Sequence, residues 1–119
     1  MGETKTYEGG CHCGKIRFRL TADLGTLTAC NCSMCGRMGW RLAFVQAKEF
    51  ELLSGEGAQT DYQFGKKHIH HPFCSTCGIR SYRHGKAKDG AEMYSVNVRC
   101  LDGVDAESLP VRHFDGKSL

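Results

Sequence analysis

The sequence has no long hydrophobic run, and that absence argues against two classes of protein. A membrane-spanning helix needs about 20 consecutive apolar residues, and no stretch of this chain approaches that length. The first ten residues, MGETKTYEGG, lack the hydrophobic core of a secretion signal. We therefore expect no membrane partner and a cytoplasmic location, where thiols stay reduced.

Proline is scarce as well. Pro72 and Pro110 are the only two in the chain, and no low-complexity run occurs. Nothing in the composition marks a linker, so residues 1–119 are predicted to form a single domain. No long amphipathic pattern predicts a helix, whereas fifteen glycines separate short segments. Short segments separated by glycines are typical of a mostly β chain.

A long basic run is also missing. The chain has 16 Lys and Arg against 13 Asp and Glu, and KKHIHH is its only cationic cluster. If seven cysteines bound two Zn²⁺ as thiolates, the formal charge of +3 would fall to zero. The slight basicity therefore gives little support to nucleic-acid binding, and no nucleic-acid partner is expected.

Alternation of apolar and polar residues predicts the strands. KIRFRLT, residues 15–21, sets Ile16, Phe18 and Leu20 against Arg17 and Arg19. Further strand candidates are WRLAFV (40–45), DYQFG (61–65), HIHHPF (68–73), IRSYRHG (79–85), EMYSVNVRC (92–100) and LPVRHFDG (109–116). QAKEFELL, residues 46–53, is predicted to form a helical turn before another strand.

Cysteine, in contrast, is abundant, with eight in 119 residues. Seven of them stand in three groups, which are Cys11 and Cys13, then Cys30, Cys32 and Cys35, then Cys74 and Cys77. C-x-C and C-x-x-C spacings direct sulfurs at one metal ion, and thiolates favour zinc among the common divalent ions. A set of buried, reduced cysteines would not explain this clustering. In the two C-x-x-C-G groups, the glycine is expected to let the backbone bend back.

The spacings leave the pairing of these groups open. They permit a zinc ribbon made of Cys32, Cys35, Cys74 and Cys77. They equally permit a site made of Cys11, Cys13, Cys74 and Cys77, which leaves the triplet of Cys30, Cys32 and Cys35 apart. Cys100 stands alone, either as a free thiol or as a fourth ligand that closes the triplet.

The motifs GGCHCGKIRF, CNCSMCGR, FCSTCG and VNVRCLDG together resemble the glutathione-dependent formaldehyde-activating enzyme family, which shares its domain with the centromere protein V group. The resemblance spans about residues 7 to 103 and implies an Mss4-like fold of small antiparallel sheets pinned by zinc. It implies a structural zinc on Cys11, Cys13, Cys74 and Cys77. It also implies a second zinc, associated with activity, on Cys30, Cys32 and Cys35.

The reaction implied by the resemblance is the formation or release of S-hydroxymethylglutathione, which is carbon–sulfur lyase chemistry. Three thiolates around Zn²⁺ leave a net charge of −1 and a free position, which suits a further soft ligand better than it suits hydroxide generation. A small thiol such as glutathione is therefore the expected partner. The alternative is a non-catalytic zinc-stabilised binding module, which the shared domain of the family allows, or a glutathione carrier, because thiols add to formaldehyde unaided.

Basic side chains near the triplet are candidates for binding the carboxylates of glutathione. Arg37 is the first candidate because it follows a ligand by two residues, ahead of Arg41 and Arg80. The six histidines are expected in solvent or beside ligands rather than on a metal.

Overall fold

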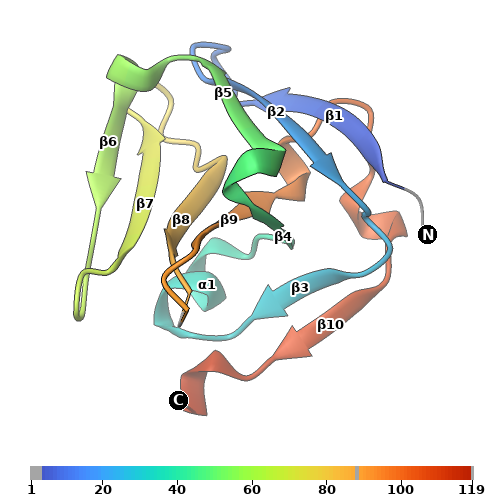
Figure 1. Cartoon of the computed structure of the whole chain (residues 1–119), viewed down its shortest axis with the longest axis vertical. Helices are drawn as coiled ribbons and strands as arrows, with labels where there is room; N and C mark the ends of the chain where they lie inside the picture. The colour runs from blue at the N-terminus through green and yellow to red at the C-terminus, as the bar shows by residue number, and fades with distance from the viewer. Residues whose placement is uncertain (1–3, 88, 119) are drawn as a thin grey trace.

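The computed structural model describes residues 4–87 and 89–118, and the ends of the predicted 1–119 domain lie outside that range. Its strands are β1 (Lys5–Gly10), β2 (Arg17–Ala22), β3 (Leu27–Cys30), β4 (Leu42–Gln46), β5 (Phe50–Ser54), β6 (Gln59–Tyr62), β7 (Ile69–Cys74), β8 (Tyr82–Lys86), β9 (Glu92–Asn97) and β10 (Val111–Phe114). Figure 1 shows these strands together with one short α-helix, α1 (Ser33–Met38). The prediction of a mostly β fold is confirmed.

Single turns of 3-10 helix join several strands. They are η1 (Ala47–Glu49), η2 (Glu56–Ala58), η3 (Val98–Cys100), η4 (Ala106–Ser108) and η5 (Gly116–Ser118). No helix among residues 4–87 and 89–118 has both the length and the apolar character needed to cross a membrane.

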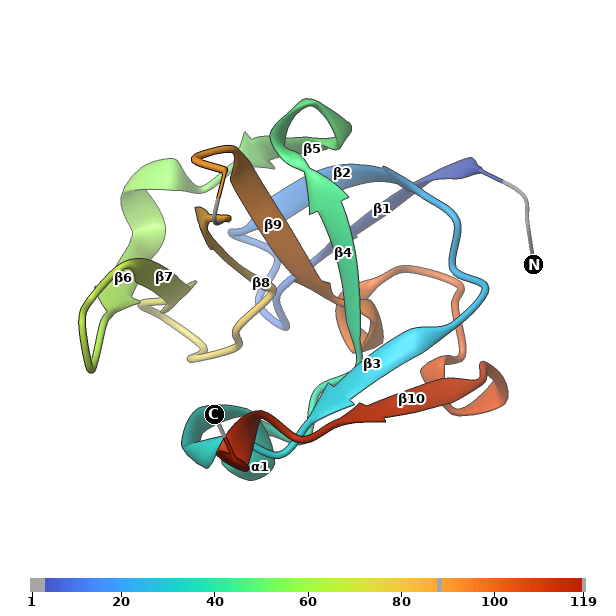
Figure 2. The ribbon, with the colours of Figure 1, turned by 60° about the horizontal axis from the view of Figure 1, so that its bottom comes forward.

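The strands form two sheets. A three-stranded antiparallel sheet has the order β1-β2-β5, and a seven-stranded sheet has the order β10-β3-β4-β9-β8-β7-β6. In the larger sheet β10 pairs with β3 in parallel, with Val111 opposite Leu27 and Phe114 opposite Cys30. Figure 2 shows β10 alongside β3 at the edge of the molecule. This pairing brings the last residues of the chain to the end of β3, where the cysteine triplet begins.

The main core lies between the two sheets. Phe18 and Leu20 of β2 are fully buried, as the alternation in KIRFRLT predicts, and they pack with Val45 of β4 and Val96 of β9. Arg19, on the outer face of β2, pairs with exposed carboxylates instead. Burial of the apolar face of each sheet against the other is the main source of stability in such a fold.

Most of the predicted strands are present. The segments 15–21, 40–45, 68–73 and 109–116 each contain a strand, and 46–53 contains η1 followed by β5. Two strands and the α-helix were not predicted from the sequence, namely β1, β3 and α1, and neither were the 3-10 turns η2 to η5. Strand β3 has four residues and α1 has six. Such short segments do not show a clear two-residue strand repeat or a 3.6-residue helix repeat in their apolar residues.

Candidate metal centres

Two groups of cysteine sulfurs converge, and each can hold a metal ion. Within each group the Sγ atoms lie within 4.8 Å of one another. One group is Cys11, Cys13, Cys74 and Cys77, and the other is Cys30, Cys32 and Cys35. Of the two four-cysteine sets that the spacings permitted, the structure forms this one, and a ribbon joining Cys32 and Cys35 to Cys74 and Cys77 does not occur.

The four-cysteine cluster joins two turns that are far apart in sequence. Cys11 and Cys13 lie in the turn between β1 and β2, and Cys13 Sγ lies 3.6 Å from Cys74 Sγ, 61 positions later. Gly14 and Gly78 each follow the last cysteine of a pair and have φ values of 85° and 81°. A Cβ is disfavoured at such angles, so glycine lets both turns bend back, as predicted for Gly78.

The distances in this cluster fit zinc. Four sulfurs placed tetrahedrally 2.3 Å from Zn²⁺ lie about 3.8 Å apart. Cys13 Sγ is 3.6 Å from both Cys11 Sγ and Cys74 Sγ. Backbone N–H groups point at the sulfurs, with Ile16 donating to Cys11 Sγ at 3.3 Å and Cys77 donating to Cys74 Sγ at 3.4 Å. Donation of this kind stabilises thiolates, so the donor set suits a soft divalent cation.

Acidity in this cluster is uneven. The backbone N–H groups of Ile79 and Cys13 lower the pKa of the Cys77 thiol to about 6. The N–H groups of Cys77 and Thr76 also hold the pKa of Cys74 below its ordinary value. The pKa of Cys13 moves the other way, to about 11, where the lowering effect of the Lys15 backbone N–H is outweighed by burial and the neighbouring thiols. Thiolates at Cys77 and Cys74 are thus favoured over their ordinary populations, which assists metal binding.

The triplet is built on the start of α1. Cys32 is the N-cap residue, and its Sγ accepts the N–H of Cys35 at 3.3 Å. The N–H of Cys32 donates to Cys30 Sγ at 3.5 Å. The expected bend at the glycine after Cys35 is wrong, because Gly36 lies inside the helix and the chain turns back at Gly39, where φ is 68°. The first turn of the helix brings the sulfurs of Cys32 and Cys35 close together. At Cys74 and Cys77 the bend at Gly78 has the same effect.

The thiols of Cys32 and Cys35 differ in acidity. Burial raises the pKa of the Cys35 thiol to about 11, against the opposing effects of Trp40 and Arg83. Burial also acts on Cys32, but the N–H of Cys35 donates to its sulfur and the pKa falls below its ordinary value. The buried Cys35 thiol is therefore the harder of these two to ionise, and a metal ion bound at the triplet would favour its thiolate.

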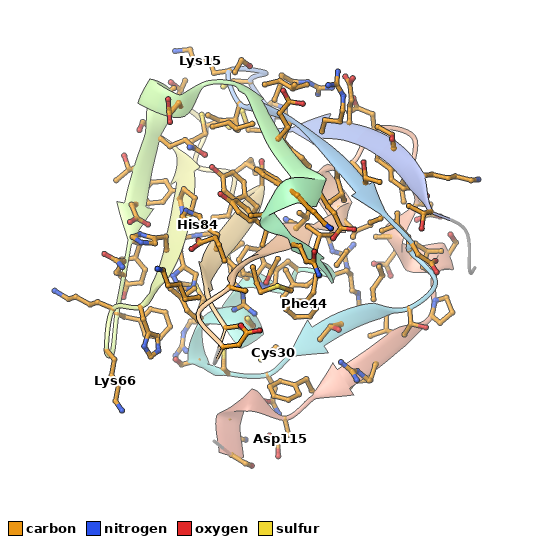
Figure 3. All side chains as sticks on the ribbon, viewed as in Figure 1. Lys15, Cys30, Phe44, Lys66, His84 and Asp115 are labelled. Carbon is orange, nitrogen blue, oxygen red and sulfur yellow. The ribbon has the colours of Figure 1, made fainter. Side chains whose placement is uncertain are left out.

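The C-terminal segment covers one side of the triplet, and sequence patterns gave no signal of it. Asn31, between two of the cysteines, donates its N–H to the Phe114 carbonyl at 3.2 Å and its Nδ2 to Asp115 Oδ1 at 2.9 Å. Its Oδ1 accepts the N–H of Lys117 at 2.9 Å. Figure 3 shows Cys30 just above the segment that carries Asp115.

Gly116 is needed where this segment meets the triplet. A Cβ at Gly116 would lie 2.7 Å from Cys30 Sγ and 3.3 Å from Cys32 Cβ. In metal-loaded protein the sulfur is fixed, so Gly116→Ala should displace the segment and expose the Lys117 N–H. Hydrogen exchange at Lys117 should speed up by at least about tenfold, since the hydrogen bond from its N–H to Asn31 Oδ1 is lost. Gly57→Ala, with no atom within 4 Å of the new Cβ, is the control. Unchanged protection in Gly116→Ala would contradict this close packing.

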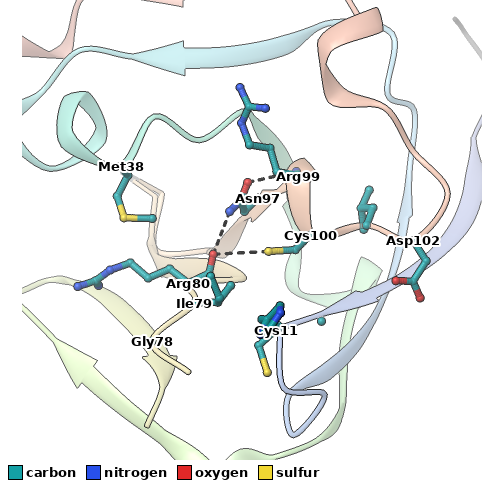
Figure 4. A pocket seen from close by; sticks show the side chains of 12 residues that line it. Cys11, Met38, Gly78, Ile79, Arg80, Asn97, Arg99, Cys100 and Asp102 are labelled. Carbon is teal, nitrogen blue, oxygen red and sulfur yellow. Dashed lines mark hydrogen bonds between the residues drawn. The ribbon is translucent and has the colours of Figure 1, made fainter. Parts of the chain in front are cut away.

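Cys100 does not complete the triplet. Its thiol is half-buried, and its Sγ lies 3.9 Å from the carbonyl of Arg80 (Figure 4). It lines a cavity of about 560 Å³ together with Cys11, Ile79 and Asn97. Among residues 4–87 and 89–118, no fourth His, Cys, Asp or Glu joins the three sulfurs within 4.8 Å.

The predicted basic residues occupy three different surroundings. Arg37, on α1, donates to the Ser33 carbonyl at 2.9 Å and lines a cavity of about 270 Å³ with Met34, Tyr62 and Phe64. Arg80 is used elsewhere: it donates to the His71 carbonyl and lies over the Phe73 ring at 4.8 Å. The half-buried Arg41 lies between the triplet helix and β4.

In the part of the chain that the structure describes, no histidine nitrogen joins either group of sulfurs, although His12 stands between Cys11 and Cys13 in the sequence. His70 Nδ1 is 2.6 Å from an Asp61 oxygen, and His84 Nδ1 is 2.7 Å from a Glu92 oxygen. One residue that sequence reasoning missed does reach a sulfur: Arg83 of β8, whose Nη1 donates to Cys35 Sγ at 3.2 Å.

Comparisons with known proteins identify the family and a similar structure. The model of the family described as glutathione-dependent formaldehyde-activating enzyme matches residues 6–114, a range that contains all seven clustered cysteines. A crystal structure of a Rhodobacter sphaeroides protein is similar, with a TM-score of 0.76 and 32% sequence identity. The alignment covers 88% of this chain and 99% of that chain.

Proposed function

This chain belongs to the glutathione-dependent formaldehyde-activating enzyme family, and on that premise we propose that it is a zinc-dependent carbon–sulfur lyase. Its substrates would be glutathione and formaldehyde, joined to or released from S-hydroxymethylglutathione, or a related thiol adduct. Residues 1–119 would act as one domain of Mss4-like fold in the cytosol.

The observation that carries this proposal is the separation of the two cysteine clusters. Cys11, Cys13, Cys74 and Cys77 form a complete set of four ligands, as structural zinc sites do. Cys30, Cys32 and Cys35 form a set of three at the edge of the fold, as catalytic zinc sites do. Cys100, the one residue that the sequence offered as a fourth sulfur, lies against Arg80 instead.

Cys30, Cys32 and Cys35 would hold the zinc ion, which would supply a site for a soft ligand and lower the pKa of a substrate thiol. The thiol would give up its proton to water, and its sulfur would attack the carbonyl carbon of formaldehyde. A carbon–sulfur bond would form as the carbonyl π bond breaks, and the oxygen would take up a proton from water, which balances the proton lost from the sulfur. No redox change is involved, and the reverse path releases formaldehyde.

The residues beside the triplet can position the rest of the thiol. Arg37 lies two residues beyond Cys35 and lines the 270 Å³ cavity, so its guanidinium can pair with a carboxylate of glutathione. Tyr62 and Phe64, both exposed, form the aromatic wall of that cavity and would cover the peptide backbone. These two aromatic residues are not part of a recognisable motif, and the sequence alone did not indicate a binding role for them.

The test combines metal content with thiol binding. We expect two zinc ions per chain, and we expect glutathione to add a sulfur ligand to one of them in zinc X-ray absorption spectra. Formaldehyde turnover, measured by NMR exchange between free and hydroxymethylated glutathione, should exceed the uncatalysed rate. Binding without turnover would favour the carrier function, and no change in zinc ligands would contradict the proposal.

Cys100→Ser tests whether the fourth position is free of protein sulfur. Because Cys100 Sγ lies against the Arg80 carbonyl, the variant should keep two zinc ions and the glutathione response. The measurement is zinc per chain by elemental analysis, compared with the wild type. Loss of one zinc ion in Cys100→Ser would show that this sulfur closes the triplet, and the proposed enzyme would lack a place for its substrate.

A further inference from the structure

Arg83 is a charged residue that contacts the triplet from outside its own segment. It lies on β8, 48 positions after Cys35, and its Nη1 donates to Cys35 Sγ at 3.2 Å. Its guanidinium also lies 5.7 Å from the centre of the Trp40 ring. Among the residues that the structure describes, no carboxylate forms an ion pair with Arg83. Its positive charge is therefore directed at the sulfur.

The two cysteine clusters differ in how their sulfurs are held. In the four-cysteine cluster, backbone N–H groups donate to Cys11 and Cys74, and Cys13 Sγ lies within hydrogen-bond distance of both sulfurs. In the triplet, Cys30 and Cys32 also accept backbone N–H groups. Cys35 is only 2% exposed, and a guanidinium takes the place of a backbone donor there.

A guanidinium at this position changes the charge of the centre. Three thiolates and one Zn²⁺ carry −1, and a fourth thiolate would raise this to −2. The permanent charge of Arg83 brings the local total back to zero before the substrate thiolate arrives. A hydrogen bond from a cation also draws electron density from the Cys35 sulfur, which makes that sulfur a weaker donor to the metal. The metal is then more able to accept another sulfur.

We propose that Arg83 is the positioning residue of the triplet centre: it holds the Cys35 sulfur in place and offsets negative charge so that the substrate binds as a thiolate. This inference rests on the proposed function for its substrate. Its structural part, the hydrogen bond to a metal-bound sulfur, is independent of any reaction.

The test uses cobalt-substituted full-length protein, in which sulfur-to-metal charge-transfer bands report on the thiolates. Subtracting the spectrum of Cys32→Ser isolates the contribution of the triplet. In Arg83→Gln the triplet band should move to longer wavelength, because a thiolate without its cationic donor gives up electrons more easily. The affinity for glutathione, followed by the same band, should fall about 10- to 100-fold. Arg83→Lys keeps the charge and should recover part of this loss.

Arg80→Gln is the matched control, since Arg80 is also half-buried and lies over an aromatic ring but donates to a carbonyl. It should leave the triplet band in place. A band position and a glutathione affinity in Arg83→Gln within twofold of wild type would overturn the proposal, as would an equal loss in Arg80→Gln.

A measurement on the wild type covers the case in which Arg83→Gln does not fold. With ¹¹³Cd as the metal, a proton on the Arg83 guanidinium should show scalar coupling to cadmium through the Cys35 sulfur. Absence of this coupling would refute the hydrogen bond. If the coupling is present but glutathione binds to neither cadmium nor cobalt protein, the proposed enzyme function fails while the role of Arg83 at the metal stands.

Discussion

Replacing Cys11 by serine should unfold the protein at room temperature or remove its cooperative thermal transition. Cys11 is buried beside Ile16 and Cys74, and its sulfur belongs to the cluster that joins turns 61 positions apart. A structural zinc site contributes about 10–16 kcal/mol of apparent binding energy, whereas a domain of this size has about 5–15 kcal/mol of net stability. Losing one of the four ligands therefore weakens zinc binding by an amount that is large compared with the net free energy of unfolding. Thermal unfolding followed by circular dichroism, with zinc present, measures this.

Cys100→Ser is the control for that experiment. Cys100 is half-buried like several ligands, but it lies outside both clusters. The same chemical change there should keep the cooperative transition and shift its midpoint by only a few degrees, as about 1 kcal/mol does. A Cys11→Ser protein with wild-type melting and two bound metal ions would show that the four-cysteine cluster is not structural.

Replacing Cys32 by serine should abolish catalysis and leave the fold intact. The triplet lies at the end of β3 and the start of α1, away from the main core of Phe18, Leu20 and Val96. Changing an outer partner of a metal ligand already costs 10–100-fold, so removing the ligand itself should cost more than about 100-fold in rate. NMR exchange spectroscopy of glutathione and formaldehyde measures the rate, and circular dichroism checks the fold.

The comparison between the two variants is what separates the roles of the clusters. Cys32→Ser should lose one metal ion of two and retain its melting transition, while Cys11→Ser should lose the transition. Should Cys32→Ser unfold the chain as Cys11→Ser does, the triplet would be a structural site, and the binding-module function would be favoured.

The sequence alone predicted much of the fold and the family. Strands with clear alternation, such as the one that buries Phe18 and Leu20, could be found because each strand carries its own period. The cysteine motifs predicted the family, and the family match over residues 6–114 confirms that resemblance. The sequence could not reveal α1, since a thiolate cap at Cys32 and six residues leave no helical pattern.

Tertiary structure decided which groups meet. The spacings allowed two pairings of the cysteines, and the choice followed from the packing of the β1–β2 turn against the end of β7 around Ile16. Likewise, Arg83 reaches Cys35 because β8 lies two strands from β4 in the larger sheet, and Gly116 meets Cys30 because β10 pairs in parallel with β3. The local sequence determines which chemical groups are available. It also determines the spacing of apolar residues, which indicates a strand or a helix. Contacts between distant segments depend on sheet order and register, which are properties of the whole chain.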